Sequence, residues 1–226
     1  MLTPPYRHII WDWNGTLLDD LEYSIDVMNG VLDRRSLPHL NRARYHALFD
    51  FPVQNYYARL GFDPAIDPFE KLSIEFISAY DARRLECALH RDTREILASI
   101  ARAGLDQSIL SAYRGETLRE IVAHFGIAGH FAHIDGLDNI HAHSKTALGR
   151  ALVARLGLPP DEILLVGDTL HDFEVAHELG IDCALVAAGH HPADRLRQVT
   201  TRVYPDLHML AAGMGLVSAT PPRAPV

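Results

Sequence analysis

The apolar residues of this chain follow two different periods, and these periods divide it into three stretches. A short apolar run at residues 8–11 predicts a buried strand that ends at Asp12. From about residue 17 to residue 89, apolar residues recur every three or four positions, which is typical of helices that bury one face. From residue 90 to about residue 216, short apolar runs alternate with helical patterns.

Two helices of the second stretch can be placed from the pattern. One buries a stripe that begins at Leu21. The other is predicted to begin at Asp67-Pro68, with the aspartate as its cap and the proline in its first turn. Their apolar stripes are Leu21, Ile25, Met28 and Leu32 in the first helix, and Leu72, Phe76, Ala79 and Tyr80 in the second.

The third stretch predicts a repeated order of helix and strand. The expected helices are residues 93–103, 117–124, 144–156, 172–179 and 193–199. The expected strands are residues 107–111, 131–135, 163–166 and 183–186. Strands that alternate with helices favour a doubly wound parallel sheet with right-handed crossovers. The predicted fold class is therefore α/β, with a helical insertion between the first strand and the rest.

Composition narrows the class of protein. The chain has 226 residues and a formal charge of −8, which argues against nucleic acid as its main partner. No apolar run reaches the ~18 residues of a membrane span, and the first residues lack the pattern of a signal peptide. Cys87 and Cys183 lie far apart, and we expect both to be reduced core residues of a cytoplasmic protein. Residues 217–226 are expected to be a disordered tail.

Two acidic motifs follow apolar runs. Residues 12–16, Asp-Trp-Asn-Gly-Thr, follow the first strand, and residues 167–172, Gly-Asp-Thr-Leu-His-Asp, follow the run at 163–166. Taken singly, Asn-Gly is also a common hairpin turn, and Asp168 is also a good helix cap. Taken together, the motifs place Asp12, Asp168 and Asp172 at the carboxyl ends of parallel strands, where acids can converge on a magnesium ion.

Two further residues complete a candidate phosphate site. Ser111 ends a predicted strand, and its hydroxyl and the N–H groups from Ala112 onward could bind a phosphoryl oxygen; a helix cap is the alternative. Lys145 begins a predicted helix, where a cation is unfavourable for the helix dipole. It and Lys71 are the two lysines among 21 basic residues, which favours a specific need for a compact charge, although a surface lysine is the ordinary alternative.

The order of these motifs resembles that of the haloacid dehalogenase-like hydrolase superfamily. The Gly-Asp-Thr-x-x-Asp form is more similar to its magnesium-dependent phosphatases than to its dehalogenases, and the phosphoglycolate phosphatase-like branch is the most similar. The resemblance implies a Rossmann-like core of residues 1–17 and 88–216. It implies that residues 18–87 form an inserted helical cap that selects the substrate, for which residues such as Arg42, Arg44, His46, Gln54, Tyr56 and Tyr57 are candidates.

The resemblance also implies roles for the motif residues. Asp12 would be the nucleophile that forms an aspartyl-phosphate, with Lys145 offsetting its charge. The implied magnesium ligands are Asp12, the backbone carbonyl of Asn14, Asp168 and Asp172. The implied phosphate-binding residues are Gly15, Thr16, Ser111, Ala112 and Lys145.

One residue departs from the pattern of the superfamily. Most of its phosphatases carry a general acid–base aspartate two residues after the nucleophile, and this chain has Asn14 there. An amide donates a hydrogen bond but delivers no proton, and acid–base catalysis is typically worth ~10²–10⁴-fold. We therefore expect slow turnover unless another group, such as His171, supplies the proton. His190 and His191 are candidates for the rim of the site.

The sequence thus predicts a Mg²⁺-dependent phosphatase of small phosphorylated metabolites, monomeric or homodimeric, with neither nucleic acid nor membrane as partner. Two alternatives stay open. Asn14 is compatible with a non-catalytic sensor of a phosphate ligand. Cleavage of carbon–halogen or phosphonate bonds also occurs in the superfamily, but the phosphonate reaction needs a cap lysine, for which the chain offers Lys71 alone.

Overall fold

The computed structural model describes residues 6–137 and 145–218. The chain separates into two compact units, one of residues 1–18 and 89–226, the core unit, and one of residues 19–88, the inserted unit. Most of the predicted tail, residues 219–226, and position 144 of the helix predicted at residues 144–156 lie outside the described residues. The expected domain bounds and the role of the insertion as a cap stay predictions.

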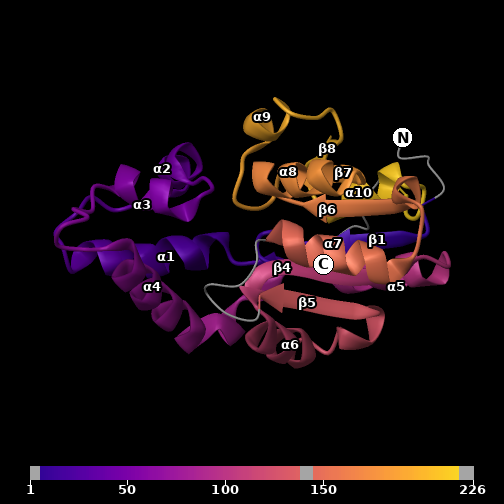
Figure 1. The fold of residues 1–226 in the computed structure, drawn as a ribbon, viewed down its shortest axis with the longest axis horizontal. Coiled ribbons are helices and arrows are strands. Elements are labelled where there is room, and N and C mark those ends of the chain that lie inside the picture. Colours follow the sequence, from indigo (N-terminus) through magenta and orange to yellow (C-terminus); the bar gives the residue numbers. More distant parts are fainter. Residues whose placement is uncertain (1–5, 138–144, 219–226) are drawn as a thin grey trace, which may run out of the picture. The chain divides into compact units, whose positions relative to one another are not determined.

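A parallel sheet forms the centre of the core unit, as predicted (Figure 1). β1 (His8–Trp11) lies in the middle of the sheet, where a strand is covered on both faces, and its four residues, three of them apolar, are all buried. It pairs in parallel with β4 on one side and with β6 on the other. Among the described residues the six strands lie in the order β5 (His133–Leu137), β4 (Asp106–Arg114), β1 (His8–Trp11), β6 (Ile163–Gly167), β7 (Asp182–Val186) and β8 (Val203–Tyr204).

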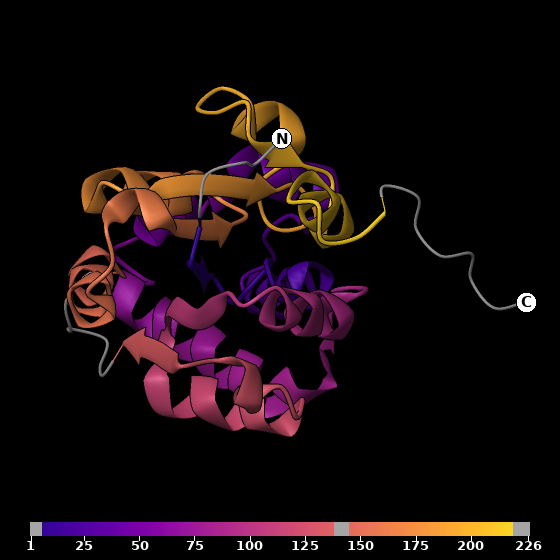
Figure 2. The same cartoon turned by 90° about the vertical axis from the view of Figure 1, so that its right-hand side faces the viewer.

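Helices cover both faces of this sheet (Figures 1 and 2). Alternate residues of each strand point to opposite faces. One face, with Ile10 and Leu165, packs on α7 (Lys145–Leu156) and α8 (Leu170–Leu179). On the other face the side chain of Gln107 donates to the Leu97 carbonyl of α5 at 3.0 Å. The remaining helices of the core unit are α5 (Thr93–Arg102), α6 (Gly115–His124), α9 (Ala193–Leu196), α10 (Leu207–Gly213) and the 3₁₀ turns η2 (Ala128–His130) and η3 (Pro160–Glu162).

The predicted elements of the core unit exist, but some of their bounds are wrong. β4 continues three residues beyond Ser111, β5 begins two residues later than expected, and α9 ends at Leu196. β8 and α10 were not predicted, because a two-residue strand and a seven-residue helix are too short for hydrophobic periodicity to detect. None of these differences moves the carboxyl ends of β1 and β6, which carry the acidic motifs.

The inserted unit is helical, as predicted. Its core is a single apolar cluster that joins the stripe of α1 to an aromatic group around Tyr45, which stacks on Phe49 at 4.9 Å. The predicted cap at Asp67 is wrong: Pro68 is the N-cap of α4, and the Asp67 carboxylate instead pairs with Arg35 at 2.9 Å. The elements of this unit are α1 (Leu21–Asp33), α2 (Arg42–Leu48), α3 (Val53–Leu60), α4 (Phe69–Arg83) and η1 (Arg84–Glu86). Where the chain passes between the units, β2 (Leu18–Asp19) pairs with β3 (Ala88–Leu89).

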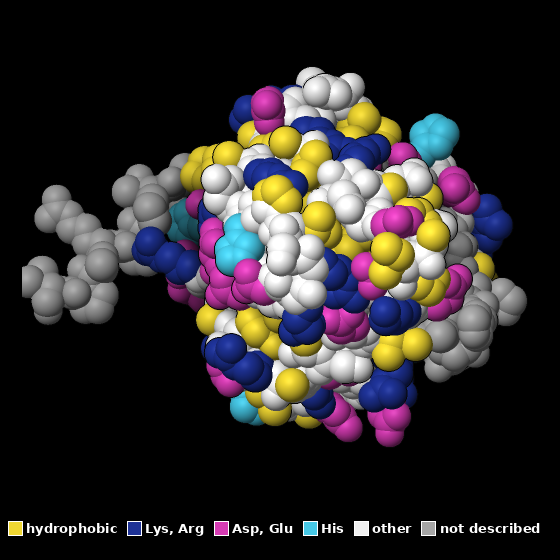
Figure 3. Space-filling view, turned by 90° about the vertical axis from the view of Figure 1, so that its left-hand side faces the viewer, with side chains coloured by type: hydrophobic (Ala, Val, Ile, Leu, Met, Phe, Trp, Pro, Cys, Tyr) yellow, Lys and Arg dark blue, Asp and Glu magenta, His cyan; other side chains and the backbone are white. Residues whose placement is uncertain are grey.

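The surface charge, the cysteines and the length of the helices were also compared with the predictions. On the face drawn in Figure 3, side chains of Lys and Arg are interspersed with those of Asp and Glu and with hydrophobic ones, so neither sign of charge dominates that face. Cys183 is buried and Cys87 is half-buried, and neither is in a disulfide. Across residues 6–137 and 145–218, no helix combines the length and the apolar character that a membrane crossing requires.

Candidate active site

The first acid of the site stands at the carboxyl end of β1. The backbone N–H of Asp12 donates to the Val166 carbonyl of β6 at 2.8 Å, which fixes the residue beside the end of that strand. The turn that follows brings the hydroxyl of Thr16 back toward the acid. This hydroxyl lies 3.4 Å from Asp12 Oδ2 and donates to Asp168 Oδ1 at 2.8 Å. The two acidic motifs, which are more than 150 residues apart, therefore meet through one hydroxyl.

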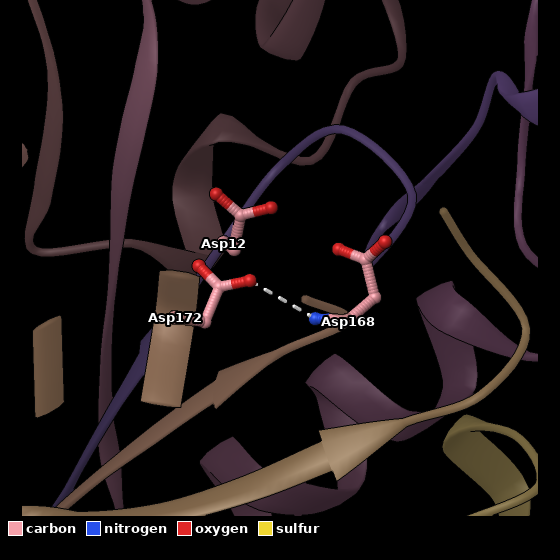
Figure 4. Close-up of side chains that lie close together, drawn as sticks. All are labelled: Asp12, Asp168 and Asp172. Carbon is pink, nitrogen blue, oxygen red and sulfur yellow. Dashed lines mark hydrogen bonds between the residues drawn. The ribbon is translucent and has the colours of Figure 1, made fainter. Parts of the chain in front are cut away.

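Asp168 and Asp172 come from the end of β6 and the first turn of α8. Thr169 is the N-cap of α8 and forms a capping box with Asp172, whose Oδ2 accepts the Thr169 N–H at 3.0 Å. The alternative that Asp168 caps this helix is therefore wrong. Figure 4 shows the carboxylates of Asp168 and Asp172 together with that of Asp12, and the Asp168 N–H donates to Asp172 Oδ2 at 3.2 Å.

Lys145, the first residue of α7, lies between two of the acids. It is 4% exposed, so the alternative of a surface lysine is wrong. Its Nζ donates to Asp12 Oδ1 and to Asp172 Oδ1, the latter at 2.5 Å. A lysine at this position is unfavourable for the helix dipole, and its two acidic partners supply the physical reason for its presence there.

Burial and nearby charges give the three acids different pKa values. Burial raises the pKa of Asp12 to about 6 against the opposing effect of Lys145, and burial raises the pKa of Asp168 to about 8. Burial also opposes ionisation of Asp172, but the attraction of Lys145 outweighs it and holds the pKa of that carboxyl at about 2. The pKa of Lys145 is raised because the attraction of Asp12 and Asp172 exceeds the effect of its burial. Asp172 is thus the ionised partner of Lys145, and Asp12 and Asp168 are short of positive charge.

The arrangement fits a divalent cation. Asp12, Asp168 and Asp172 each offer one carboxylate oxygen, and these oxygens lie within 4.8 Å of one another. Oxygen ligands are those that Mg²⁺ prefers, and a doubly charged ion would offset the negative charge that one ammonium leaves. The three acids named as metal ligands from the sequence are therefore together in space, as a metal site requires.

Two glycines allow two loops to close over Asp168. Gly15 has φ +73°, and a Cβ on it would lie 2.3 Å from Asp168 Oδ2. Gly189 is as close, because its Cβ would lie 2.2 Å from the same oxygen. The next residue, His190, donates its backbone N–H to Asp168 Oδ2 at 2.7 Å. Because a Cβ at either glycine would lie within 2.3 Å of Asp168 Oδ2, any side chain there would displace the carboxylate.

The other predicted phosphate-binding residues lie at the same edge of the sheet. The register pairs Trp11 with Ile109, so Ser111 lies beyond the last paired residue of β1. It is level with the start of the loop of residues 12–17, called the catalytic loop from here on. The Ser111 side chain is buried, and its Oγ accepts the Tyr113 N–H at 3.1 Å, whereas Ala112 is exposed. The roles of Ser111 and Ala112 toward phosphate stay predictions.

Asn14 and the three histidines have different environments. Asn14 is half-buried and forms an isolated bridge with Leu18. His171 lies in the first turn of α8, and burial lowers its pKa. His191 is fully buried, and its Nδ1 accepts the N–H of Leu170 at 3.0 Å, so it caps α8. His190 is also buried and holds Asp168 through its backbone N–H. Their role at the rim of the site stays a prediction.

Several residues suggested for substrate selection have structural roles in the inserted unit. Arg42 pairs with Glu22 at 2.7 Å, and Arg44 donates to the carbonyl of His39 at 2.8 Å. Tyr56 and Tyr57 are buried in the aromatic cluster. The substrate-binding role of this group stays a prediction.

Comparison with known proteins agrees with this geometry. A family model described as haloacid dehalogenase-like hydrolase matches residues 9–186. The chain belongs to the haloacid dehalogenase-like hydrolase family. The matched segment includes Asp12, Lys145, Asp168 and Asp172, so the resemblance inferred from the motifs is confirmed.

Several relatives within the haloacid dehalogenase-like family carry names of phosphatases or of a nucleotidase, and others carry the name of a tyrosine-protein kinase. The chain is 27% identical over 195 residues to an N-acetylmuramic acid 6-phosphate phosphatase of Pseudomonas putida, which covers 83% of this chain and 86% of that one. It is 28% identical over 200 residues to a 5'-nucleotidase of Pseudomonas aeruginosa, with 85% and 87% covered. The fold is similar to that of a predicted phosphoglycolate phosphatase from Haemophilus somnus, with a TM-score of 0.73 and 21% identity over 95% of this chain and 99% of that one.

The sequence did not reveal every residue that shapes this haloacid dehalogenase-like site. The segment Gly189–His190 acts through a close approach and a backbone N–H, neither of which depends on a recognisable side chain. Its position after β7, at the same edge as β1 and β6, was the available signal, because parallel strands bring their following loops to one edge. Thr169 was also missed as the cap of α8, although a threonine three residues before Asp172 has the spacing of a capping box.

Proposed function

We propose that this protein is a Mg²⁺-dependent phosphatase of small organic phosphates that acts through an aspartyl-phosphate on Asp12. The observation that carries the proposal is the buried group of three carboxylates around Lys145, whose Nζ contacts Asp12 and Asp172. A carboxylate held beside an ammonium and two further acids suits attack on a phosphoryl group that arrives with a cation. The phosphatase names of the relatives support the same reaction class.

In the proposed reaction a carboxylate oxygen of Asp12 attacks phosphorus. The bond from phosphorus to the ester oxygen breaks, and the leaving alkoxide takes up a proton from solvent water. Water then attacks the phosphorus of the aspartyl-phosphate, the bond to Asp12 breaks, and inorganic phosphate leaves. Lys145 holds the Asp12 carboxylate in place and offsets negative charge on the phosphoryl oxygens.

Asp12, Asp168, Asp172 and the carbonyl of Asn14 would hold the Mg²⁺ ion. When bound, the ion supplies charge neutralisation between the carboxylate and the phosphate. Thr16 and the His190 N–H keep Asp168 oriented by occupying one hydrogen-bonding position on each of its oxygens. Ser111 and the N–H groups that follow it would bind the phosphoryl oxygens from β4.

Asn14 makes the proposed enzyme slow toward alkyl phosphates. Its amide can donate a hydrogen bond to the leaving oxygen but delivers no proton, and it has no base for the second step. Aryl and acyl phosphates, whose leaving groups need little protonation, should be hydrolysed better. An aspartyl-phosphate should therefore accumulate on Asp12.

The test is phosphate release from a panel of aryl and alkyl phosphates with Mg²⁺ and with EDTA. Asp12→Ala should lower turnover by roughly 10⁴–10⁶-fold, whereas Asp19→Ala, the loss of an exposed acid seven residues further on, should leave it unchanged. Asn14→Asp should raise turnover of alkyl phosphates by about 10²–10⁴-fold. Residue 14 must be checked by mass spectrometry, because deamidation of Asn-Gly would produce the same aspartate.

The outcomes separate the alternatives. Halide release that survives EDTA would indicate a dehalogenase. Binding of phosphate esters by calorimetry without turnover, in wild type and Asn14→Asp alike, would indicate a sensor. Equal turnover of wild type and Asp12→Ala would rule out the proposed nucleophile.

A further inference from the structure

His90 contacts the loop that carries the proposed nucleophile, although it lies 78 residues further along the chain. Its Nε2 lies 2.9 Å from the carbonyl oxygen of Gly15. A carbonyl oxygen can only accept, so Nε2 must carry the hydrogen. The same nitrogen is protonated in the imidazolium form, so this contact persists whether His90 is neutral or charged.

The backbone of His90 is fixed on both sides. Its N–H donates to the Leu17 carbonyl at 2.9 Å, which is a second bond to the same loop. Its carbonyl accepts the hydroxyl of Thr93 at 2.7 Å, and Thr93 is the buried first residue of α5. His90 therefore joins the catalytic loop to the start of a helix that packs on the sheet.

The peptide that His90 holds lies directly against Asp168. Gly15 is in contact with Asp168 Oδ2, and its carbonyl oxygen would lie 2.4 Å from a Cβ on Gly189. The residue after Gly15 is Thr16, whose hydroxyl donates to Asp168 at 2.8 Å. A shift of the Gly15 carbonyl would move Thr16 and bring a second negative oxygen close to the carboxylate.

We propose that His90 is a positioning residue, which holds the Gly15 carbonyl so that Thr16 can keep Asp168 and Asp12 in the geometry that the reaction needs. The proposal rests on the proposed function for its effect on turnover, but not for its effect on the loop itself. His90 touches neither the phosphate nor the reacting carboxylate, so it acts through Gly15 and Thr16. Partners of this kind typically change metal affinity or activity by roughly 10- to 100-fold when they are removed.

The chain offers a matched control on the same side of the core unit. His90 lines a cavity of about 140 Å³, and His208 lines it as well. His208 contacts the carbonyl of Ser218 at 2.9 Å and Asp92 at 3.6 Å, which are outside the catalytic loop. A substitution at His208 changes the same cavity without touching the loop.

The test compares His90→Phe, which keeps a ring but removes the donor, with His90→Gln, whose amide N–H can replace Nε2–H. His90→Phe should lower kcat by roughly 10- to 100-fold with little change in KM, and should weaken Mg²⁺ binding in calorimetry by a similar factor. His90→Gln should recover most of both, and His208→Phe should match the wild type. In the metal-free protein, hydrogen exchange of the amides of residues 16–18 should be faster in His90→Phe than in His90→Gln.

Each result decides the proposal. Equal kcat, Mg²⁺ affinity and loop exchange in His90→Phe and wild type would overturn it, as would an equal loss in His90→Phe and His90→Gln. If His90→Phe does not fold, His90→Asn replaces it: its amide is too short to reach Gly15, so activity equal to that of His90→Gln would overturn the proposal. If wild type hydrolyses no phosphate, the proposed function fails, and loop exchange and Mg²⁺ affinity still decide the role of His90.

Discussion

The buried polar groups at the two ends of β1 are stabilised in opposite ways. At the amino end, His8 Nε2 lies 2.9 Å from Ser108 Oγ, and both side chains are buried. Burial lowers the pKa of His8 to about 4, so this pair is neutral at pH 7. At the carboxyl end, four residues away, Asp12 lies in a buried group with two other acids and one ammonium.

The difference separates a structural pair from a functional site. A neutral hydrogen-bonded pair satisfies both members and leaves no charge for a ligand to offset. Burial raises the pKa of Asp12 and of Asp168, so these acids resist ionisation beside a single ammonium, and their ionised forms are stabilised when a further cation binds. The carboxyl end of the sheet is thus the less stable end without its ligand, which is the expected relation between stability and function.

We expect the largest loss of stability from Lys145→Met, at the carboxyl end of β1, which is called the charged end from here on. It removes the cation that pairs with Asp12 and Asp172, and leaving buried charges without a partner costs about 3–5 kcal/mol. We expect the free energy of unfolding at pH 7 without Mg²⁺ to fall by that amount in urea denaturation. Lys71→Met is the matched control: Lys71 is 58% exposed and pairs with Asp67, so its loss should cost about 0–1 kcal/mol. Equal losses in the two variants would contradict the role given to Lys145.

Mg²⁺ should stabilise the folded protein through the acids at the carboxyl end of β1, and not through the pair at its amino end. A ligand at 100 times its dissociation constant stabilises the folded state by about 2.7 kcal/mol. We expect this gain in wild type and its loss in Asp168→Asn, measured by thermal unfolding with and without Mg²⁺. His8→Gln, at the other end of β1, should keep the full gain. Stabilisation of Asp168→Asn as large as that of wild type would count against the metal site.

The sequence allowed much of the charged end to be predicted, because its acids follow apolar runs. Four buried residues, three of them apolar, precede Asp12, and five buried residues form the strand before Asp168, so their positions at strand ends followed from the hydrophobic pattern. That parallel strands bring such ends together is a general rule of these sheets. The position of Lys145 between two acids rested on weaker evidence, namely the rarity of lysine in this chain.

Other features of the fold and site could not be predicted in this way. The approach of Gly189 to Asp168 and the donor that His90 provides to Gly15 depend on tertiary contacts that leave no periodic pattern. The cap of α4 was misassigned because Asp67 has a stronger partner, Arg35, from the turn that follows α1. The neutral pair of His8 and Ser108 was not foreseen, since a polar residue within an apolar run gives no sign of its partner.

The pH dependence of stability should reveal the contribution of His8, at the amino end of β1. Because burial lowers the pKa of folded His8 to about 4 from its usual 6.5, the unfolded chain binds one more proton than the folded one between these values. Stability from this residue is therefore complete above pH 6.5 and falls by about 1.4 kcal/mol per pH unit as pH falls toward 4. Asp106 opposes this shift and His133 adds to it. The difference in unfolding free energy between wild type and His8→Gln should follow this slope; a constant difference would contradict it.

The smallest effect is expected for the hydrogen bond of the neutral pair itself. Ser108→Ala leaves His8 Nε2 buried without its hydroxyl partner, which should cost about 1–3 kcal/mol, less than Lys145→Met. In the double variant His8→Phe with Ser108→Ala, both polar groups are gone, and part of the loss should return because no buried group lacks a partner. A double-mutant cycle of urea denaturations should therefore give a coupling energy of about 1 kcal/mol between the two positions. Purely additive losses would mean that the pair contributes packing alone, and the contrast between the two ends of β1 would then rest on charge and not on hydrogen bonding.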